Sequence, residues 1–246
     1  MIECALLSLY LSAAEQNDCD REVPQPLTIE YYERPPYAWT GADGKAHGMA
    51  VDPVRAALDK AGLAFRFVAV PSSRELVDIA RADHPVCAVG RYKTPQREQQ
   101  AKFSGMLMEE RPYAAFTRAD LPLGGETDLA DLLGKPALRI VVKLQRSYGA
   151  RIDEALASAR SALMPISGNA FNAVRMVQSR RADVALLTLD EVDFVTEALG
   201  MAPSSYSIAR LSGFDRGEKN YLMCSKASDD SMLRYIDAKL AAQTPH

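Results

Sequence analysis

The sequence predicts an α/β protein made of two lobes. Apolar segments typical of buried strands alternate with segments of helical periodicity, and this alternation restarts after a gap near the middle of the chain. A length of 246 residues suits two lobes of about 100 residues each. The last strand and helix have no partner set of their own, so we expect the chain end to return to the first lobe.

The first half contains three predicted strands and two predicted helices. Strands are expected at 26–32, 65–70 and 86–90, the last short and wholly apolar, as buried parallel strands tend to be. The apolar residues of the segment from Met49 to Gly62 recur with helical spacing, which predicts a helix. Gly62 suits the C-terminus of that helix. The second helix begins at the sequence Ser-Ser-Arg-Glu, which predicts a capping box between Ser72 and Glu75.

The second half repeats the alternation. Strands are expected at 113–117, 138–142 and 184–189, with a loop and a short helix between the first two. One helix follows the second strand, and another begins at Asn169, a plausible N-cap. The chain closes with a strand at 220–224 and a helix capped by Asp229 or Asp230.

Composition and motifs exclude several function classes. The net charge is −3 with the charges mixed, so nucleic acid is not an expected partner. No apolar run reaches the roughly 18–20 residues that span a bilayer. Dinucleotide-binding and phosphate-binding glycine loops are absent, and none of His47, His84 and His246 has metal-ligand spacing. We therefore expect no cofactor, no metal and no catalytic set, which leaves ligand binding as the default.

The N-terminus has the pattern of a secretory leader. An apolar run at 4–14 ends in Ser-Ala-Ala, which fits cleavage after Ala14, and we assign 1–22 to this leader. Glu3 stands where a basic residue is usual, and the alternative is an ordinary N-terminal helix. Cleavage after Ala14 would remove Cys4 and leave Cys19, Cys87 and Cys224, so at most one internal disulfide is possible.

One segment carries the functional interpretation. In "GRYKTPQREQQAKFS", residues 90–104, a strand ends in a small residue and is followed by Thr94, Arg97 and the pair Phe103-Ser104. Weaker motifs appear in a fixed order elsewhere: Pro36-Tyr37 with Gly48 and Asp52, "GKPALRIVVKLQRSYG" at 134–149, and "SRRADVALL" at 179–187. Together they resemble bacterial extracellular solute-binding proteins of family 3, the periplasmic receptors of amino acid ABC transporters.

The resemblance implies a periplasmic binding protein of type 2, the Venus flytrap fold, with the ligand in a cleft between the lobes. Lobe 1 would comprise 23–112 and 211–246, and lobe 2 would comprise 113–210. It further implies a periplasmic monomer without a cofactor that binds a small carboxylate, expected to be an amino acid. The protein partner would be the permease of an ABC transporter.

Arg97 is the principal candidate for ligand binding. The matching Arg of the family clamps the ligand carboxylate, because a guanidinium can donate two parallel hydrogen bonds to it. The alternative is an Arg paired with Glu98 or solvated at a helix start. The resemblance brings further candidates: Gly90, Tyr92, Tyr31, Tyr32, Arg34, Ser72, Arg146, Ser147 and Tyr148.

The sequence does not decide which residue would face a ligand ammonium. Thr188 or Asp190 matches the Asp of the family, depending on a gap of two residues. If Thr188 takes the place, no anion faces the ammonium, and the ligand need not be an amino acid. A cleft rich in Arg and Tyr suits an acidic or aromatic carboxylate.

Two other functions fit the same scaffold. A cyclohexadienyl dehydratase-like lyase would need a carboxylic acid in the cleft, for which Glu30, Glu33 and Asp190 are candidates. An orphan sensor would present its ligand to a membrane receptor. Loss of the diene of prephenate or arogenate would identify the lyase, and neighbouring genes for a permease and an ATPase would favour the transport receptor over the sensor.

Overall fold

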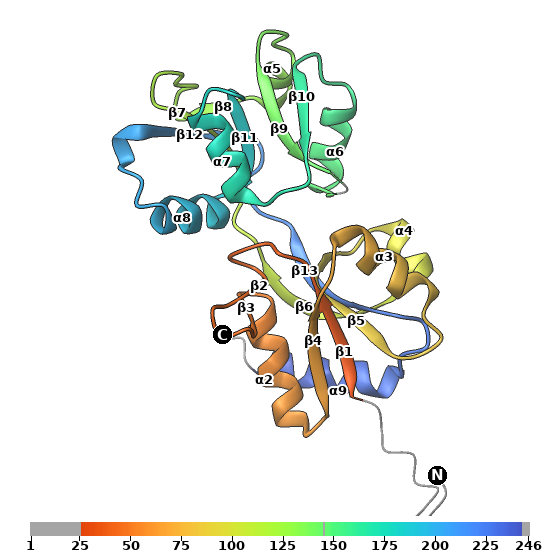
Figure 1. Cartoon of the computed structure of the whole chain (residues 1–246). Coiled ribbons are helices and arrows are strands. Elements are labelled where there is room, and N and C mark those ends of the chain that lie inside the picture. The colour runs from red at the N-terminus through yellow and green to blue at the C-terminus, as the bar shows by residue number, and fades with distance from the viewer. Residues whose placement is uncertain (1–25, 145, 243–246) are drawn as a thin grey trace, which may run out of the picture.

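The computed structural model describes residues 26–144 and 146–242, and the predicted leader lies outside these ranges. The described elements form two α/β lobes that lie end to end and are joined by two crossing segments (Figure 1). Each lobe has one main sheet with helices packed against it. The two-lobed α/β fold expected from the sequence is confirmed.

The first lobe is built on a sheet in the order β4-β1-β5-β13-β6. The first three of these strands run parallel, and β13 is antiparallel to both of its neighbours. The late strand thus returns to the first lobe, as its lack of a partner set predicts. The strands are β1 (Leu27–Tyr31), β4 (Phe65–Ala69), β5 (Val86–Tyr92), β6 (Lys102–Glu109) and β13 (Lys219–Cys224).

Within the described residues, four helices and a small hairpin complete this lobe. Gly62 ends α2 in the left-handed conformation (φ 64°), and Asp229 caps α9, as expected. The capping box predicted at Ser72 is wrong: the helix begins at Ser72 without a side-chain cap, because Glu75 is buried in an ion pair with Arg91 instead. The elements are α2 (Val51–Ala61), α3 (Ser72–Arg81), α4 (Pro95–Gln100), α9 (Asp230–Ala241), β2 (Trp39–Thr40) and β3 (Ala46–His47).

The second lobe has a six-stranded sheet in the order β10-β9-β11-β7-β12-β8. Side chains of β11 alternate between its two faces, so that Leu186 joins one apolar core and Leu187 the other. The strands are β7 (Tyr113–Arg118), β8 (Glu126–Thr127), β9 (Arg139–Lys143), β10 (Ala162–Ile166), β11 (Val184–Thr188) and β12 (Tyr206–Leu211).

Helices cover both faces of the second sheet. Residues of α5 and α6 belong to one core, and residues of α7 and α8 belong to the other. Asn169 caps α7, as expected from the sequence. No helix in the described parts of the chain is long and apolar enough to cross a membrane. The helices are α5 (Leu129–Leu133), α6 (Ala150–Ala157), α7 (Ala170–Gln178), α8 (Leu189–Ala198) and a 3₁₀ turn (Pro203–Ser205).

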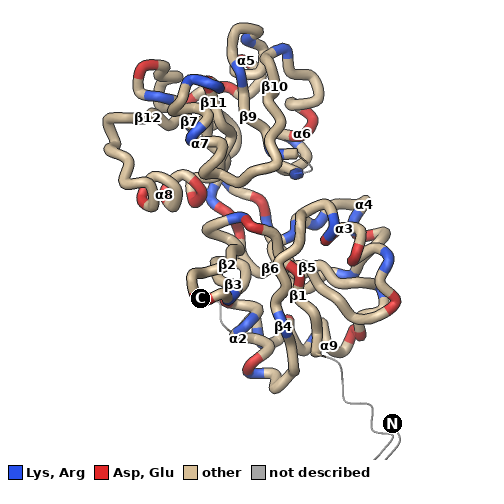
Figure 2. Tube along the Cα trace, in the orientation of Figure 1, with Lys and Arg blue, Asp and Glu red and all other residues tan. Residues whose placement is uncertain are grey.

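The chain passes between the lobes twice, through residues 110–112 after β6 and through residues 212–218 before β13. Charged residues of both signs lie on and beside these segments (Figure 2). The crossings therefore place ionisable groups where the two lobes meet.

A disulfide joins Cys87 of β5 to Cys224 of β13. The two residues are register partners in the antiparallel pair, and both are fully buried. The bridge therefore closes a long loop of the chain that includes the whole second lobe. Disulfides of this kind persist in oxidising compartments.

Candidate ligand-binding cleft

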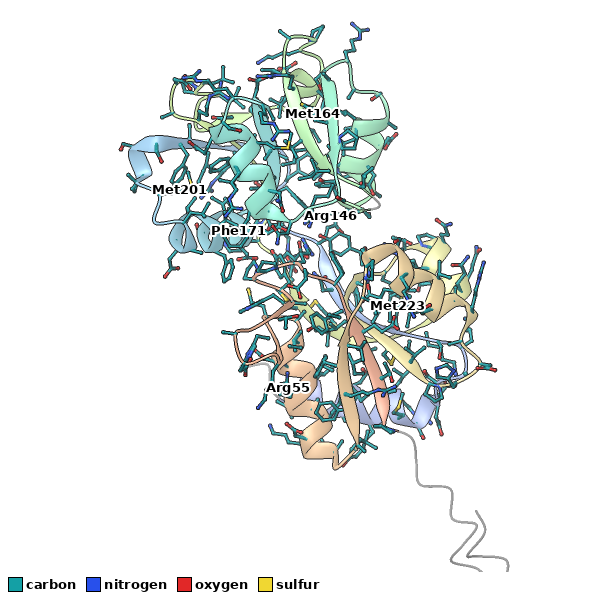
Figure 3. The ribbon with its side chains drawn as sticks, in the orientation of Figure 1. Arg55, Arg146, Met164, Phe171, Met201 and Met223 are labelled. Atoms are coloured by element: carbon teal, nitrogen blue, oxygen red, sulfur yellow. A yellow bond between two sulfur atoms is a disulfide. The ribbon has the colours of Figure 1, made fainter. Side chains whose placement is uncertain are left out.

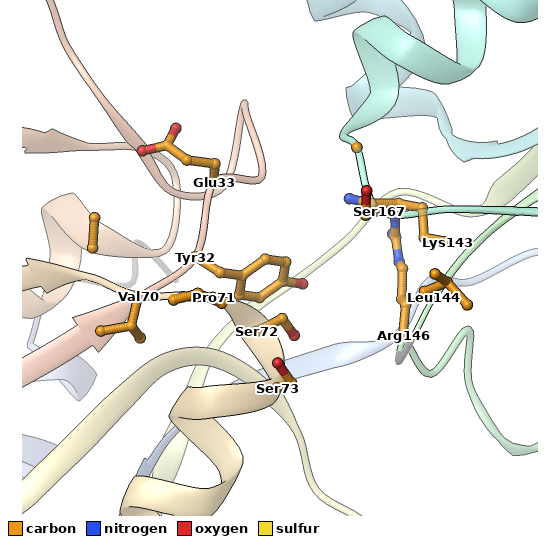
Figure 4. A pocket seen from close by; sticks show the side chains of 12 residues that line it. Tyr32, Glu33, Val70, Pro71, Ser72, Ser73, Lys143, Leu144, Arg146 and Ser167 are labelled. Atoms are coloured by element: carbon orange, nitrogen blue, oxygen red, sulfur yellow. The ribbon is translucent and has the colours of Figure 1, made fainter.

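A cavity of about 530 Å³ opens between the two lobes. Its volume lies in the range of roughly 300–1,000 Å³ that is typical of small-molecule sites. One wall comes from the loop after β1 and the start of α3, and the other comes from the segment after β9. Figure 4 labels the facing side chains: Tyr32, Ser72 and Ser73 from the first lobe, and Lys143 and Arg146 from the second.

A smaller cavity adjoins the first, and Tyr32 and Arg146 line both. It contains Arg97, which the turn before α4 positions. Thr94 caps this helix by accepting a hydrogen bond from the backbone N–H of Arg97 (3.3 Å). The Arg97 guanidinium then folds back and donates through Nη1 to the backbone oxygen of Tyr92 (2.8 Å).

Arg97 is half-buried, and no carboxylate of the described residues forms an ion pair with it. Glu98, the alternative partner, pairs with Lys93 instead (3.1 Å). Burial lowers the pKa of Arg97, because the cationic form has lost hydration that no anion replaces. An anionic ligand would supply the missing charge.

Tyr32 lies between two cations. The Arg91 guanidinium is 4.5 Å from its ring centroid, and the Lys143 ammonium is 5.9 Å from it. Arg91 is buried in an ion pair with Glu75, and burial lowers its pKa to about 10. The ring thus faces the cavity with its position fixed by charged neighbours.

A buried ion network links the two lobes beside this cleft. Arg34, in the loop after β1, donates two hydrogen bonds to Glu110 of the first crossing (2.5 and 2.8 Å). Its Nε also contacts Glu191 of α8 in the second lobe (3.2 Å). Both carboxylate side chains are completely buried. These bonds occupy Arg34, so its charge is neutralised within the protein although it lines the smaller cavity.

Arg146 completes the network from the second lobe. It donates to both oxygens of Glu191 (2.9 and 3.3 Å) and to the hydroxyl of Tyr113 (2.6 Å). It is labelled at the boundary of the lobes in Figure 3. Burial alone would raise the pKa of Glu191, but the guanidiniums of Arg146 and Arg34 outweigh that effect and lower it. Glu191 is therefore a permanent anion that holds two arginines.

Tyr92 faces the same network. Its hydroxyl donates to Glu110 (2.8 Å) and is 3.0 Å from the hydroxyl of Tyr113. Burial raises the pKa of Tyr92, which keeps the hydroxyl protonated as a donor. Its backbone oxygen also anchors Arg97. Tyr92 and Gly90, two of the candidates named from the sequence, line the smaller cavity.

Thr188 and Asp190, the two candidates for an ammonium partner, do not line either cavity. Thr188 caps α8 by accepting from the N–H of Glu191 (3.2 Å), and its hydroxyl is 2.7 Å from that of Tyr37. Asp190 accepts hydrogen bonds from the Tyr37 hydroxyl and from the backbone N–H of Arg111, both at 2.9 Å. The structure therefore turns the Asp190 carboxylate toward the first crossing.

Two further candidates also lie away from the cavities. Tyr31 is buried in the first-lobe core, with its hydroxyl bonded to Thr40 (2.8 Å). Tyr148 is buried in the second-lobe core, where its hydroxyl accepts from the backbone N–H of Lys143 (2.7 Å). Neither ring lines either cavity, because each packs into the apolar core of its lobe.

Ser147 lines the smaller cavity, but its hydroxyl donates to Asp153 (2.6 Å). Asp153 also accepts from the backbone N–H of Tyr148 (2.8 Å). The hydroxyl of Ser147 and the backbone N–H of Tyr148 are thus both occupied by a carboxylate of α6. Within the described residues, no group of three His, Cys, Asp or Glu side chains is arranged to hold a metal ion.

The model of the family named "Bacterial extracellular solute-binding proteins, family 3" matches residues 27–243. The chain belongs to this family. The match covers both lobes and includes the segment 90–104 that carries the resemblance. Family members are extracellular solute-binding proteins, so the cleft just described is where a solute site is expected.

Solved structures of this fold resemble the chain over nearly its whole length. An ancestral arginine-binding protein bound to arginine has a TM-score of 0.72 at 18% identity, covering 88% of this chain and 91% of its own. A histidine kinase sensor domain with similarity to periplasmic binding proteins has 0.71 at 18%, covering 89% and 90%. An ancestral amino-acid-binding protein, a precursor of cyclohexadienyl dehydratase, has 0.70 at 17%, covering 88% of each. At these identities the likeness shows the fold alone.

A curated relative is the membrane-bound lytic murein transglycosylase F of Ectopseudomonas mendocina (strain ymp). It is 29% identical over 167 residues, which are 66% of this chain. The match spans only 31% of that enzyme. The chain therefore corresponds to a minor part of this relative.

Sequence reasoning missed Lys143, Glu110 and Glu191 as members of the site. Arg34 and Glu191 are 157 positions apart in the sequence, so no local sequence pattern predicts their contact. A weak signal did exist at Glu191, because Thr188 and Glu191 have the spacing of a capping box, which the structure confirms. Lys143 follows a predicted strand, and only the fold shows that its side chain enters the cleft.

Proposed function

We propose that this family member captures a small carboxylate in the cleft between its lobes and delivers it to the permease of an ABC importer. The observation that carries the proposal is Arg97, a half-buried guanidinium in a cavity, held in place by Tyr92 and paired with no carboxylate of the described residues. A ligand carboxylate fits its free donors, because guanidinium and carboxylate match in geometry and charge.

The location follows from the same proposal. An importer receptor acts outside the cytoplasmic membrane, so we place the mature protein in the periplasm, as a monomer, after removal of the N-terminal leader. The disulfide between Cys87 and Cys224 supports an oxidising compartment. Amino acids belong to the proposed ligand class, and solved neighbours are described as bound to arginine and to glutamine.

The lyase alternative has weaker support in the cleft. Its general acid would have to line the cavity and hold a proton near neutral pH. Burial, and then the charge of Asp78, raises the pKa of Glu30 to about 7, but Glu30 does not line either cavity. Glu33 lines the larger cavity, yet it is exposed and accepts hydrogen bonds from Thr40. Asp190 faces the first crossing.

Calorimetry with the Arg97→Ala variant tests the proposal. A thermal-shift screen of amino acids and organic acids first selects a ligand. The variant should then bind that ligand about tenfold to several hundredfold more weakly, if about 1.5–3 kcal/mol is lost with the charge-assisted bonds. Arg81→Ala, which removes an exposed Arg from α3, is the matched control. Equal affinity in the Arg97 variant and the wild type would sink the proposal.

A further inference from the structure

The cleft contains more positive charge than the protein neutralises. Of the residues that the structure describes, five cationic side chains line the two cavities: Arg34, Arg91, Arg97, Lys143 and Arg146. Buried carboxylates of Glu110, Glu191 and Glu75 form ion pairs with three of them. Among the described ion pairs, none involves Arg97 or Lys143.

Lys143 stands opposite the first-lobe wall. It lines the larger cavity at the end of β9, and Figure 4 shows its amine directed into that space beside Ser167. Arg97 lines the adjoining smaller cavity on the first lobe. Because Tyr32 and Arg146 line both cavities, the two unpaired cations face adjoining spaces.

Negative charge in the cleft is correspondingly scarce. Glu33 is the sole carboxylate among the described residues that line the two cavities, and it is exposed and bonded to Thr40. Asp190 is occupied by Tyr37 and Arg111. Among the described residues that line the two cavities, a ligand ammonium would meet two cations without an ion pair and no carboxylate other than Glu33.

We propose that the ligand is a small dianion, with one acid group bound by Arg97 on the first lobe and a second bound by Lys143 on the second lobe. This rests on the proposed solute-binding function and specifies its substrate class. An amino group on the ligand adds nothing to affinity, because no carboxylate is placed to receive it. Closure then brings the two cations onto the two ends of one molecule.

The charge state of Lys143 makes this binding depend on pH. Burial, and then repulsion from Arg146, lowers the pKa of Lys143 to about 7. A second acid group of the ligand would favour the ammonium form, so binding takes up a proton near neutral pH. The charged and titratable groups around Lys143 are Arg146 and Tyr148 on its own segment, Arg34 and Tyr32 from the loop after β1, Glu110 from the first crossing and Glu191 from α8.

The test compares dicarboxylates with their monoamides. Succinate, glutarate and adipate, their monoamides, L-glutamate, L-glutamine and L-arginine are titrated by calorimetry into wild type, Arg97→Ala, Lys143→Gln and Lys135→Gln. Lys135 is an exposed residue of the same lobe and serves as the matched control. Glutamine at 143 keeps most of the side-chain length and removes only the charge.

We expect wild type and the control to bind a dicarboxylate at least tenfold more tightly than its monoamide, and the Lys143 variant to lose that preference. Glutarate should bind at least as tightly as L-glutamate. In wild type, the affinity for the dicarboxylate should fall as the pH rises from about 6 to about 8, because Lys143 loses its proton. In Lys143→Gln the affinity should stay constant over the same range.

Two outcomes overturn the proposal in different ways. If L-glutamine, L-arginine or a monoamide binds more tightly than every dicarboxylate and depends on Arg97 but not on Lys143, the solute-binding function stands and the dianion does not. If no compound of the set binds, both are contradicted.

Discussion

Removing the charge of Glu191 should destabilise the whole protein. In the Glu191→Gln variant the amide oxygen can still accept from the N–H of Thr188, as the carboxylate does (3.1 Å). Arg34 and Arg146 lose their shared anion while they remain buried. Breaking a buried ion pair on one side costs about 3–5 kcal/mol, and we expect a loss in that range at pH 7.

Urea unfolding followed by circular dichroism measures this loss, and Glu197→Gln, an exposed change on the same helix, is the control. Folding lowers the pKa of Glu191 from its ordinary value of 4.5, so its contribution to stability is full above that value and is lost progressively as the pH falls from there through the lower pKa of the folded state. The difference between wild type and variant should therefore shrink at acid pH. A loss below about 1 kcal/mol at pH 7 would refute the view that this network holds the lobes together.

Three further predictions concern the disulfide, Lys143 and the leader. Replacing both Cys87 and Cys224 with Ser should cost about 2–5 kcal/mol of stability, measured by urea unfolding, and a reducing agent should have the same effect on wild type. Folding lowers the pKa of Lys143 from 10.5 to about 7, so between these two pH values the folded state binds fewer protons than the unfolded state. Urea unfolding at several pH values should therefore show that wild type gains stability relative to Lys143→Gln as the pH rises from about 7 to about 10. When the chain is expressed with residues 1–22 in place, the mature protein should be recovered from the periplasm with an N-terminus near Glu15; an uncleaved chain in the cytosol would contradict the leader.

Buried elements with strong local signals could be predicted from the sequence. The strand expected at 86–90 lies within β5, and Asn169 and Gly62 bound their helices as expected. Strands β6, β10 and β12 were missed, because β6 has only one buried residue in eight and β10 contains Pro165. Helix α8 was missed although Thr188 and Glu191 carry its capping signal.

The site could be predicted only where its geometry is local. Thr94, Pro95 and Arg97 define one short turn, so the position of Arg97 is inherent in the sequence. Pairings over long distances in the chain could not be predicted, and they decide which cations are free. Arg34 and Arg97 look alike in the sequence, yet Glu110 and Glu191 neutralise the first and leave the second available.

Small-angle scattering tests most directly whether the cleft is the site of a solute receptor. A ligand that bridges Arg97 on one lobe and Lys143 on the other binds a closed form better than an open one, so it shifts the population toward closure. We predict that a saturating dicarboxylate selected by the thermal-shift screen lowers the radius of gyration of wild type and of Lys135→Gln. The same ligand, bound to saturation by Arg97→Ala at a higher concentration, should produce less compaction. Tight binding to wild type with an unchanged radius of gyration would contradict the account.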